Sequence, residues 1–338
     1  MRRAVSGAVL ALLGWLACAP AAGAAEKAPS FADLPGWAGD DHAAALAAFL
    51  RTCRGGRALC AAARAARDAG GAAPRLFFES WFEPAQEQQG FLTGYFEPEV
   101  PGSLTPDAAH PTPLLTRPAS LAGLPDREAI EAGALGAAAR PLVYLDPVDA
   151  FMVHVQGSAR IRLGDGRVLR VGFDGKNGHP YTAIGKVLAE REGLPPSEVT
   201  ADRLWAWLKA HPGKAPEIMR ANHSYIFFKR VGTEAALGPV GGAGVPLTAG
   251  RSLAVDRRAR PYGTLVWLEG ELPQPEGGTA PLRRLAVAQD TGTAIVGPAR
   301  GDLFFGSGER AGAAASLVRH PVRWVVLREK PQAKRARR

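Results

Sequence analysis

Two aspartates near the C-terminal end have the residue type and spacing that best fit acid–base chemistry. Both lie in the stretch 283–310, RRLAVAQDTGTAIVGPARGDLFFGSGER, where Asp290 ends an alternating strand pattern and Asp302 follows a glycine-rich segment. The triplet Asp290-Thr291-Gly292 predicts a turn, because glycine accepts backbone angles that other residues avoid. We therefore expect both carboxylates on loops beside a rigid scaffold, which is where catalytic groups are often found.

The neighbours of Asp302 favour a functional role for this carboxyl. The apolar residues 303–305 follow it directly, and burial beneath them would raise its pKa, as a general acid requires. An alanine-rich helix is expected from about Glu309, with Ser307 as its N-cap. The start of a helix stabilises a nearby negative charge, so it would favour the ionised form of Asp302 and lower its pKa. An aspartate in a glycine-rich turn often only caps the backbone, so this structural role stays open.

The rest of the chain predicts mostly strands, with helices at the N-terminal end. Alanine-rich patterns predict helices at 41–53 and 59–69. Glu97 could be a second carboxylate at the site or an exposed charge on an edge strand, and we expect the exposed charge. The other expected strands are 91–100, 151–161, 168–173, 222–228, 252–255, 264–268 and 323–327, and the other expected helices are 185–190 and 201–210. Residues 151–173 are expected to form a hairpin around a Gly-Asp-Gly turn.

The N-terminus predicts a secretory signal peptide over residues 1–24. It combines Arg2-Arg3, an apolar run from Val5 to Leu16 and an Ala-Gly-Ala cleavage motif at 22–24. The apolar run is too short to span a membrane. Cys18 lies near a lipoprotein-type sequence, so a lipid-anchored form is the alternative to cleavage after the motif.

Composition is typical of a globular chain, and the formal net charge of +9 fits an acidic polymer as partner. Nucleic acid, an anionic lipid surface and a carboxylate-bearing glycan all meet this description. Part of the charge lies in the basic tail 331–338. Basic motifs interleaved with aromatic residues, typical of nucleic-acid-binding modules, do not occur in the sequence, so we do not expect nucleic acid as the partner.

Cys53 and Cys60 remain after the predicted cleavage. One continuous helix would hold them ~10 Å apart, which is too far for a disulfide. Gly55-Gly56 breaks the helix, so a disulfide across a turn and two buried free thiols both fit the sequence. The sequence contains no CxxC, HExxH, GxSxG, Walker or GxGxxG motif, and we expect neither a metal nor a cofactor.

Longer motifs along the chain resemble the membrane-bound lytic murein transglycosylase A family. Besides QDTGTAI and RGDLFFGSGERAG, they are TGYFEP at 93–98, DPVDAFMVHVQGSARIRL at 146–163, GKNGHPYTAIGK at 175–186, NHSYIFF at 222–228 and PLTAGRSLAVD at 246–256. The resemblance covers residues 76–327, which is most of the mature chain. One departure is Thr293, where the family usually has a glycine.

The resemblance implies a mainly β fold with flanking helices. A double-psi β-barrel domain would be formed by residues 25–103, which include the N-terminal helices, together with residues 245–330. A second β-rich domain, residues 104–244, would be inserted into it, with a groove between the two domains. The proline-rich composition from residue 104 and the glycine-rich stretch 238–244 are consistent with such an insertion.

The resemblance also implies a reaction. Lytic transglycosylases cleave the β-1,4 bond between MurNAc and GlcNAc in peptidoglycan without water, because the 6-hydroxyl of the sugar attacks C1 and leaves a 1,6-anhydro end. An internal nucleophile has a high effective molarity, so one residue can serve as acid and then as base. The matching motifs assign that role to Asp302, with Asp290 as a hydrogen-bonding support. The expected glycan contacts are Thr93, Gly94, Tyr95, Gln156, Ser158, Asn177 and Arg251, each of which has a structural role as an equal alternative.

Two other functions fit the same residues. A water-using glycosidase would employ Asp290 and Asp302 as an acid pair, and a non-enzymatic module would only bind the cell wall. The resemblance implies peptidoglycan glycan strands as the partner, a monomer, and a periplasmic location with an anchor in the outer membrane as the alternative.

Overall fold

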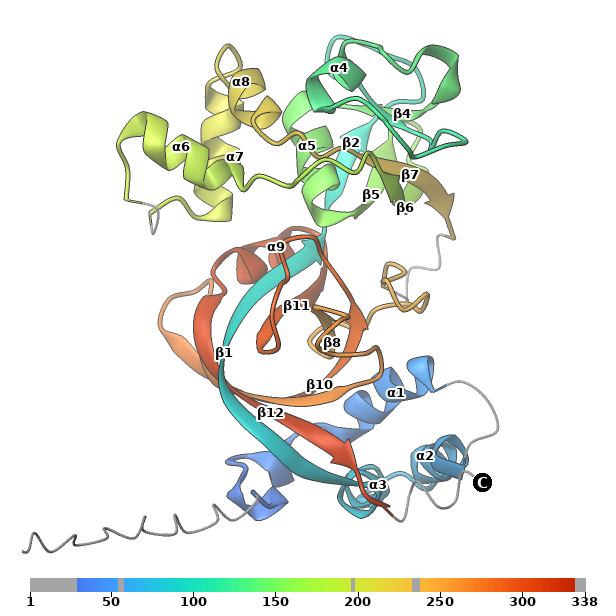
Figure 1. The fold of residues 1–338 in the computed structure, drawn as a ribbon, viewed down its shortest axis with the longest axis vertical. Coiled ribbons are helices and arrows are strands. Elements are labelled where there is room, and N and C mark those ends of the chain that lie inside the picture. Colours follow the sequence, from blue (N-terminus) through green and yellow to red (C-terminus); the bar gives the residue numbers. More distant parts are fainter. Residues whose placement is uncertain (1–28, 54–57, 196–197, 233–237, 332–338) are drawn as a thin grey trace, which may run out of the picture.

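The computed structural model describes residues 29–53, 58–195, 198–232 and 238–331 (Figure 1). The predicted signal peptide, Cys18 and residues 332–338 of the basic tail lie outside them. In the described part of the chain, no helix has the length and the apolar composition needed to cross a membrane.

Among the described residues, three helices precede the first strand. They are α1 (His42–Thr52), α2 (Ala58–Ala69) and α3 (Ala73–Trp81), after two short 3-10 turns at Phe31–Asp33 and Trp37–Gly39. The carboxylate of Asp41 begins α1 by accepting a hydrogen bond from the amide of Ala44 (2.9 Å). Cys53 and Cys60 form a disulfide between α1 and α2, with their Cα atoms 5.7 Å apart. This pairing resolves the alternative that the sequence left open.

Six strands form a closed barrel in the order β1-β11-β8-β10-β9-β12. Their bounds are β1 Phe82–Glu97, β8 Ser252–Val255, β9 Leu265–Pro273, β10 Thr279–Asp290, β11 Arg300–Ser307 and β12 Arg319–Glu329. Two pairs, β1 with β11 and β8 with β10, are parallel. The barrel is built from both ends of the chain and confirms the predicted barrel domain with flanking helices.

Alternation along β10 explains how the barrel acquires two buried layers. Leu285 and Val287 pack with Trp267 and the residues of α1 and α3, outside the barrel. Ala286 and Ala288, which point the other way, pack in the barrel interior. Because helices α1–α3 cover this part of the barrel, away from the second domain (Figure 1), successive residues of one strand are buried on both faces.

A second β-rich domain joins the barrel at the end of β1. Its main sheet has the order β2-β5-β6-β7, and β3 pairs with β4. The strands are β2 Glu99–Gly102, β3 Thr112–Leu115, β4 Pro141–Leu145, β5 Ser158–Leu163, β6 Val168–Lys176 and β7 Ile226–Val231. The helices are α4 Arg127–Glu131, α5 Pro147–Gln156, α6 Ile184–Glu192, α7 Ala201–Ala210 and α8 Ala215–Arg220, with a 3-10 turn at Gly136–Ala138. The chain changes from barrel to second sheet between Glu97 and Glu99, whereas the domain boundaries expected from the sequence stay a prediction.

One strand predicted in this domain is wrong. Residues 151–156 belong to helix α5, because the Asp146 carboxylate accepts hydrogen bonds from the amides of Val148 (2.9 Å) and Asp149 (3.1 Å) and thereby caps the helix. Gly157 ends the helix with a φ of 82°, in the left-handed region that suits glycine. The hairpin itself is confirmed, since β5 and β6 are antiparallel neighbours.

Candidate active site

The parallel strands β1 and β11 bring the TGYFEP and RGDLFFG motifs side by side. Thr93 lies opposite Asp302 in the register. Leu92 and Leu303 are fully buried in the barrel core, so their neighbours Thr93, Tyr95 and Asp302 lie on the opposite, outer face of the strand pair. Asp302 is therefore held inside a strand. The prediction that it lies on a loop was wrong, and its position is more rigid than expected.

The carboxyl of Asp302 is poorly solvated. Its Oδ1 is buried and has no hydrogen-bond partner among the described residues, although the residue as a whole keeps some exposure. This burial raises the pKa of Asp302 to about 6, while the Thr93 side chain and the charge of Arg300 act in the opposite direction. A carboxyl that retains a proton close to neutral pH has the property that a general acid requires.

Arg300 connects to Asp302 through Thr93. Its Nη2 donates a hydrogen bond to Thr93 Oγ1 (2.8 Å), and its guanidinium carbon lies 5.8 Å from the centre of the Phe91 ring. Its positive charge favours the ionised form of Asp302. The sequence placed Arg300 in the right stretch without a role. Only the register of the two strands shows that Arg300 lies where its charge lowers the pKa of Asp302.

Asp290 is the last residue of β10 and is fully engaged as an acceptor. Its Oδ2 accepts a hydrogen bond from the Tyr95 hydroxyl (2.8 Å), and its Oδ1 accepts from the amides of Gly242 (2.8 Å) and Thr291 (2.9 Å). Burial raises the pKa of Asp290, and these three hydrogen bonds oppose that shift. Asp290 therefore fixes the Tyr95 side chain and the returning segment around Gly242.

The second domain contributes the other side of the site. Tyr181 follows β6. Burial raises the pKa of its phenol, the charge of Arg127 opposes this shift, and the charge of Asp302 adds to it, so the ring lies within electrostatic range of the Asp302 carboxyl. A cavity of about 500 Å³ adjoins it between the segment 181–190 and the barrel residues Thr293 and Ala294. Lys176 Nζ donates a hydrogen bond to Thr293 Oγ1 (3.3 Å) and spans the two domains here. Asp302 thus lies where the two domains meet.

Comparisons with known proteins match both parts of the chain. Residues 91–229 match the family profile "MltA specific insert domain" and residues 251–328 match "3D domain". The membrane-bound lytic murein transglycosylase A of Escherichia coli K12 is 35% identical over 248 residues, which are 72% of this chain. This match spans 66% of the length of that relative.

Solved structures agree over a larger part of the chain. The crystal structure of a membrane-bound lytic murein transglycosylase from Agrobacterium tumefaciens is 33% identical, with a TM-score of 0.76, and the match covers 91% of this chain and 99% of that one. The chain belongs to the membrane-bound lytic murein transglycosylase A family. E. coli MltA with bound chitohexaose is 27% identical, with a TM-score of 0.73, over 86% of this chain and 91% of that one. Proteins named as lytic murein transglycosylases are enzymes, so this chain belongs to an enzyme family.

Gly94 of the family motif TGYFEP is a packing position. A Cβ atom built on it would lie 2.8 Å from the backbone of Ala315 in helix α9 (Glu309–Ser316). Another part of the chain therefore approaches the backbone closely here, which is a common reason for glycine in a strand. Helix α9 begins after Gly308, which has a φ of 84°, so the prediction of Ser307 as the N-cap was wrong.

Glu97, at the end of the same motif, is the main residue that sequence reasoning misjudged. It is 0% exposed, so it is not an exposed edge charge. Its carboxylate accepts two hydrogen bonds from Arg170 (2.7 and 2.7 Å), one from Arg160 (3.2 Å) and one from the Ser307 hydroxyl (2.6 Å). The arginines belong to the second domain and Ser307 to the barrel, so Glu97 joins the two domains at the chain crossing.

Three residues expected to contact glycan lie in the second domain. Gln156 Oε1 accepts a hydrogen bond from the Phe96 amide (3.2 Å), and Ser158, at the start of β5, is 8% exposed. Asn177 is 4% exposed, and its Nδ2 donates to the carbonyls of Pro125 and His223 (3.0 Å each). Asn177 therefore supports the loop that carries Tyr181, and we do not retain it among the proposed contacts.

Arg251 is also placed in a structural position. It is 6% exposed, and its Nη1 and Nη2 donate hydrogen bonds to the two carboxylate oxygens of Asp40 (2.8 Å each). Nη1 also donates to the Leu285 carbonyl (3.0 Å). This buried ion pair ties the N-terminal segment to the barrel, so Arg251 is not retained as a glycan contact either.

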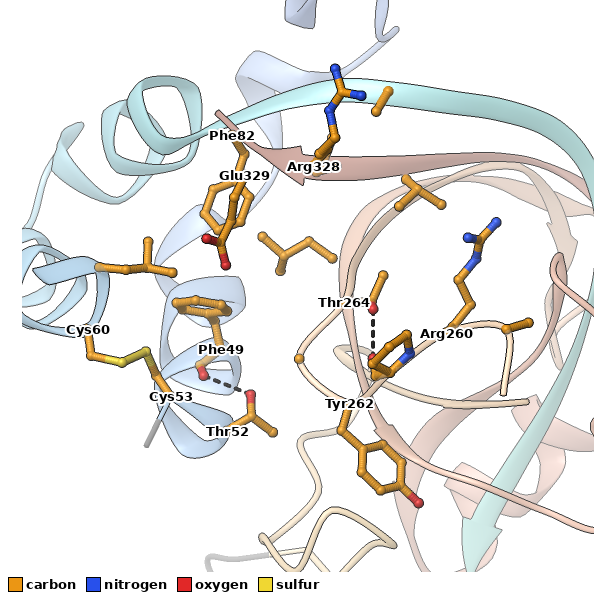
Figure 2. A pocket seen from close by; sticks show the side chains of 18 residues that line it. Phe49, Thr52, Cys53, Cys60, Phe82, Arg260, Tyr262, Thr264, Arg328 and Glu329 are labelled. Carbon is orange, nitrogen blue, oxygen red and sulfur yellow. Dashed lines mark hydrogen bonds between the residues drawn. A yellow bond between two sulfur atoms is a disulfide. The ribbon is translucent and has the colours of Figure 1, made fainter. Parts of the chain in front are cut away.

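A second cavity of about 500 Å³ lies between the disulfide-linked helices and the barrel (Figure 2). Phe49, Phe82 and the Cys53–Cys60 disulfide line one side of it, and Arg260 and the segment 261–265 line the other. None of the predicted site residues contributes to its lining. Within the described ranges, no group of three His, Cys, Asp or Glu side chains is arranged to hold a metal ion.

Proposed function

We propose that this chain cleaves the β-1,4 bond between MurNAc and GlcNAc in peptidoglycan and leaves a 1,6-anhydroMurNAc end. The observation that carries the proposal is the buried Oδ1 of Asp302 at the junction of the two domains, for which the described part of the chain offers no hydrogen-bond partner. Membership of the murein transglycosylase family supports the choice of substrate. The chitohexaose bound by the E. coli relative supports a β-1,4-linked glycan as the ligand of the groove.

Asp302 acts twice in the proposed reaction. Its protonated carboxyl gives a proton to the glycosidic oxygen while the bond from that oxygen to C1 breaks. The C6 hydroxyl oxygen of the same MurNAc ring then bonds to C1, and its proton passes to the Asp302 carboxylate. The carboxyl is regenerated, and no water is consumed. A pKa of about 6 suits both steps, because neither protonation state is strongly disfavoured near neutral pH.

The remaining groups position the sugar and the carboxyl. Thr93 and Arg300 adjust the proton affinity of Asp302 from the neighbouring positions on β1 and β11. Tyr95 is fixed through its hydrogen bond to Asp290, and Tyr181 lies on the side of the second domain. Gln156 and Ser158 remain proposed contacts with the glycan beyond this centre.

The arrangement favours one catalytic acid over an acid pair. A nucleophile or general base needs a carboxylate oxygen free to reach C1 or a water molecule. Both oxygens of Asp290 already accept hydrogen bonds from Tyr95, Gly242 and Thr291. Asp290 is therefore proposed as a support for Tyr95, as the sequence suggested, and not as the second catalytic acid of a hydrolase.

The family places the protein in the cell envelope, since its members are named membrane-bound murein transglycosylases. We propose the periplasm as the compartment, as a monomer that acts on glycan strands, with an outer-membrane anchor through Cys18 as the alternative. The Cys53–Cys60 disulfide supports an oxidising compartment.

A product analysis in ¹⁸O-labelled water tests the proposed reaction. Murein sacculi are digested with the purified protein, and the released muropeptides are weighed by mass spectrometry. Anhydro ends that are one water lighter than reducing ends and carry no ¹⁸O support the proposal. Reducing ends labelled with ¹⁸O would show a hydrolase, and binding to sacculi without any release would show a wall-binding module.

A further inference from the structure

The cavity between the two domains has walls of different chemistry. Tyr181, Thr182 and Ala183 line it together with the first turns of α6, and Thr293 and Ala294 line it from the barrel. The α6 residues that contribute are Lys186, Val187 and Glu190. The wall thus carries one cation, one anion and two threonine hydroxyls, and Ala183, Val187 and Ala294 are its aliphatic part.

This cavity lies beside the catalytic carboxyl without containing it. Tyr181 is the shared element, because it lines the cavity and its phenol lies within electrostatic reach of Asp302. On the barrel side, Thr293 follows Asp290 by three positions and is linked to the second domain by its hydrogen bond from Lys176 (3.3 Å). Through Tyr181, a glycan bound at Asp302 would come within reach of the cavity.

Each muramoyl residue of murein carries a lactyl group at C3, from which the stem peptide extends sideways. The stem peptide has free carboxylates and, on its diamino acid, a free amino group. Lys186 and Glu190 are both exposed on the same side of α6, four residues apart, and offer a partner for each kind of charge. A volume of about 500 Å³ accommodates several peptide residues.

We propose that this cavity is a subsite for the stem peptide of the muramoyl residue next to the cleaved bond, with Lys186 binding a peptide carboxylate and Glu190 the free amino group. This inference rests on the proposed function and adds its substrate class: the protein would prefer peptide-substituted murein to bare glycan. Thr293 shapes the barrel side of the subsite. The peptide then anchors the glycan at a distance from the reacting bond.

Binding measurements with three ligands test this subsite. The ligands are chitohexaose, a muramoyl tetrasaccharide with free lactyl carboxylates, and the same tetrasaccharide with its stem peptides. Dissociation constants are measured by calorimetry in the Asp302→Asn background, so that no turnover occurs. Lys186→Ala and Glu190→Ala are each expected to weaken binding of the peptide-substituted ligand by roughly fivefold more than binding of chitohexaose.

Matched controls come from the same domain. Lys214 and Glu192 form an exposed ion pair (3.9 Å) outside the cavity, and Lys214→Ala and Glu192→Ala are expected to leave all three dissociation constants within twofold. Equal losses on all three ligands, or no loss on any, would overturn the subsite. A loss that is as large on the peptide-free muramoyl ligand would also overturn it and would assign the cavity to the lactyl carboxylate.

The two proposals fail in different ways. If the wild-type protein releases no anhydro product, the proposed reaction is wrong whatever the binding data show. If anhydro product forms and the Lys186 and Glu190 variants bind all ligands as the control variants do, the reaction stands and only the peptide subsite is wrong.

Discussion

Thr93 and Asp302 lie directly opposite each other on the parallel strands β1 and β11. The pairing brings a motif from the first third of the chain next to Asp302, near its C-terminal end. It also places Arg300, two residues before Asp302, within hydrogen-bonding distance of Thr93 (2.8 Å). Burial thus raises the pKa of Asp302, and Thr93 and Arg300 act in the opposite direction.

The rate of murein cleavage should fall as the pH rises above about 6. Burial raises the pKa of Asp302 to about 6, and the first step requires the protonated carboxyl. Well above this pH, kcat/KM should drop about tenfold per pH unit. Rates of anhydro-muropeptide release between pH 4.5 and 9 measure the alkaline limb. A rate that stays constant up to pH 9 would exclude Asp302 as the acid.

Arg300 should control the position of that limb. Its charge lowers the pKa of Asp302, so Arg300→Gln should move the alkaline limb to higher pH, while Arg300→Lys, which keeps the charge, should move it less. Arg310→Gln is the matched control, because Arg310 is exposed on α9 in the same stretch. The explanation fails if Arg300→Gln leaves the limb in place or moves it to lower pH.

Asp302 should also make the fold less stable at neutral pH. Its folded pKa of about 6 lies above the ordinary value of 3.8, so the folded state holds the proton more tightly than the unfolded state. The free energy of unfolding should therefore fall as the pH rises from about 4 to 6. Above pH 6, Asp302 should cause no further decrease. At pH 8, the free energy of unfolding of Asp302→Asn, measured in urea, should be roughly 1–3 kcal/mol higher than that of the wild type, so the variant should be more stable. At pH 4 the difference should disappear, and a variant that is less stable at pH 8 would contradict this.

Glu97 should be far more important for stability than its neighbour Glu99. Replacing Glu97 by Gln removes the buried carboxylate that pairs with Arg170, which is 4% exposed, and breaking a buried pair in this way costs about 3–5 kcal/mol. Glu99→Gln removes only an ion pair to Arg162, whose side chain is 58% exposed, and should cost less than about 1 kcal/mol. Urea unfolding of both variants measures the contrast. Equal losses in the free energy of unfolding would show that Glu97 does not stabilise the contact between the two domains.

The sequence predicted helices and strands well where one segment had a regular pattern and a clear end. The strand that ends at Asp290, the helices split by Gly55-Gly56 and the hairpin turn near Asp165 are examples. It failed at residues 151–156, where a buried helix was read as an alternating strand. The Asp146-Pro147 pair is a helix-start signal, and it was the clue in the sequence.

The site was predictable as a set of motifs but not as a geometry. Asp302 and Asp290 became candidates because they lie in one stretch with glycine turns and apolar residues. Thr93 and Tyr95 became candidates through the family resemblance. The roles of Glu97 and Arg300 depend on pairings between strands far apart in the chain, which no local pattern encodes. The ion pair of Arg251 could not be predicted for the same reason, since its partner Asp40 lies near the other end of the chain.

The catalytic role of Asp302 is tested most directly by Asp302→Asn, which keeps the shape of the side chain and removes its titratable proton. The rate of anhydro-muropeptide release from sacculi is measured at pH 5.5 for the variant and the wild type, with urea unfolding as proof that both are folded. We predict a loss of at least about a hundredfold in a variant that is fully folded. A folded variant that retains more than a tenth of the wild-type rate would contradict the assignment of Asp302 as the single acid and base.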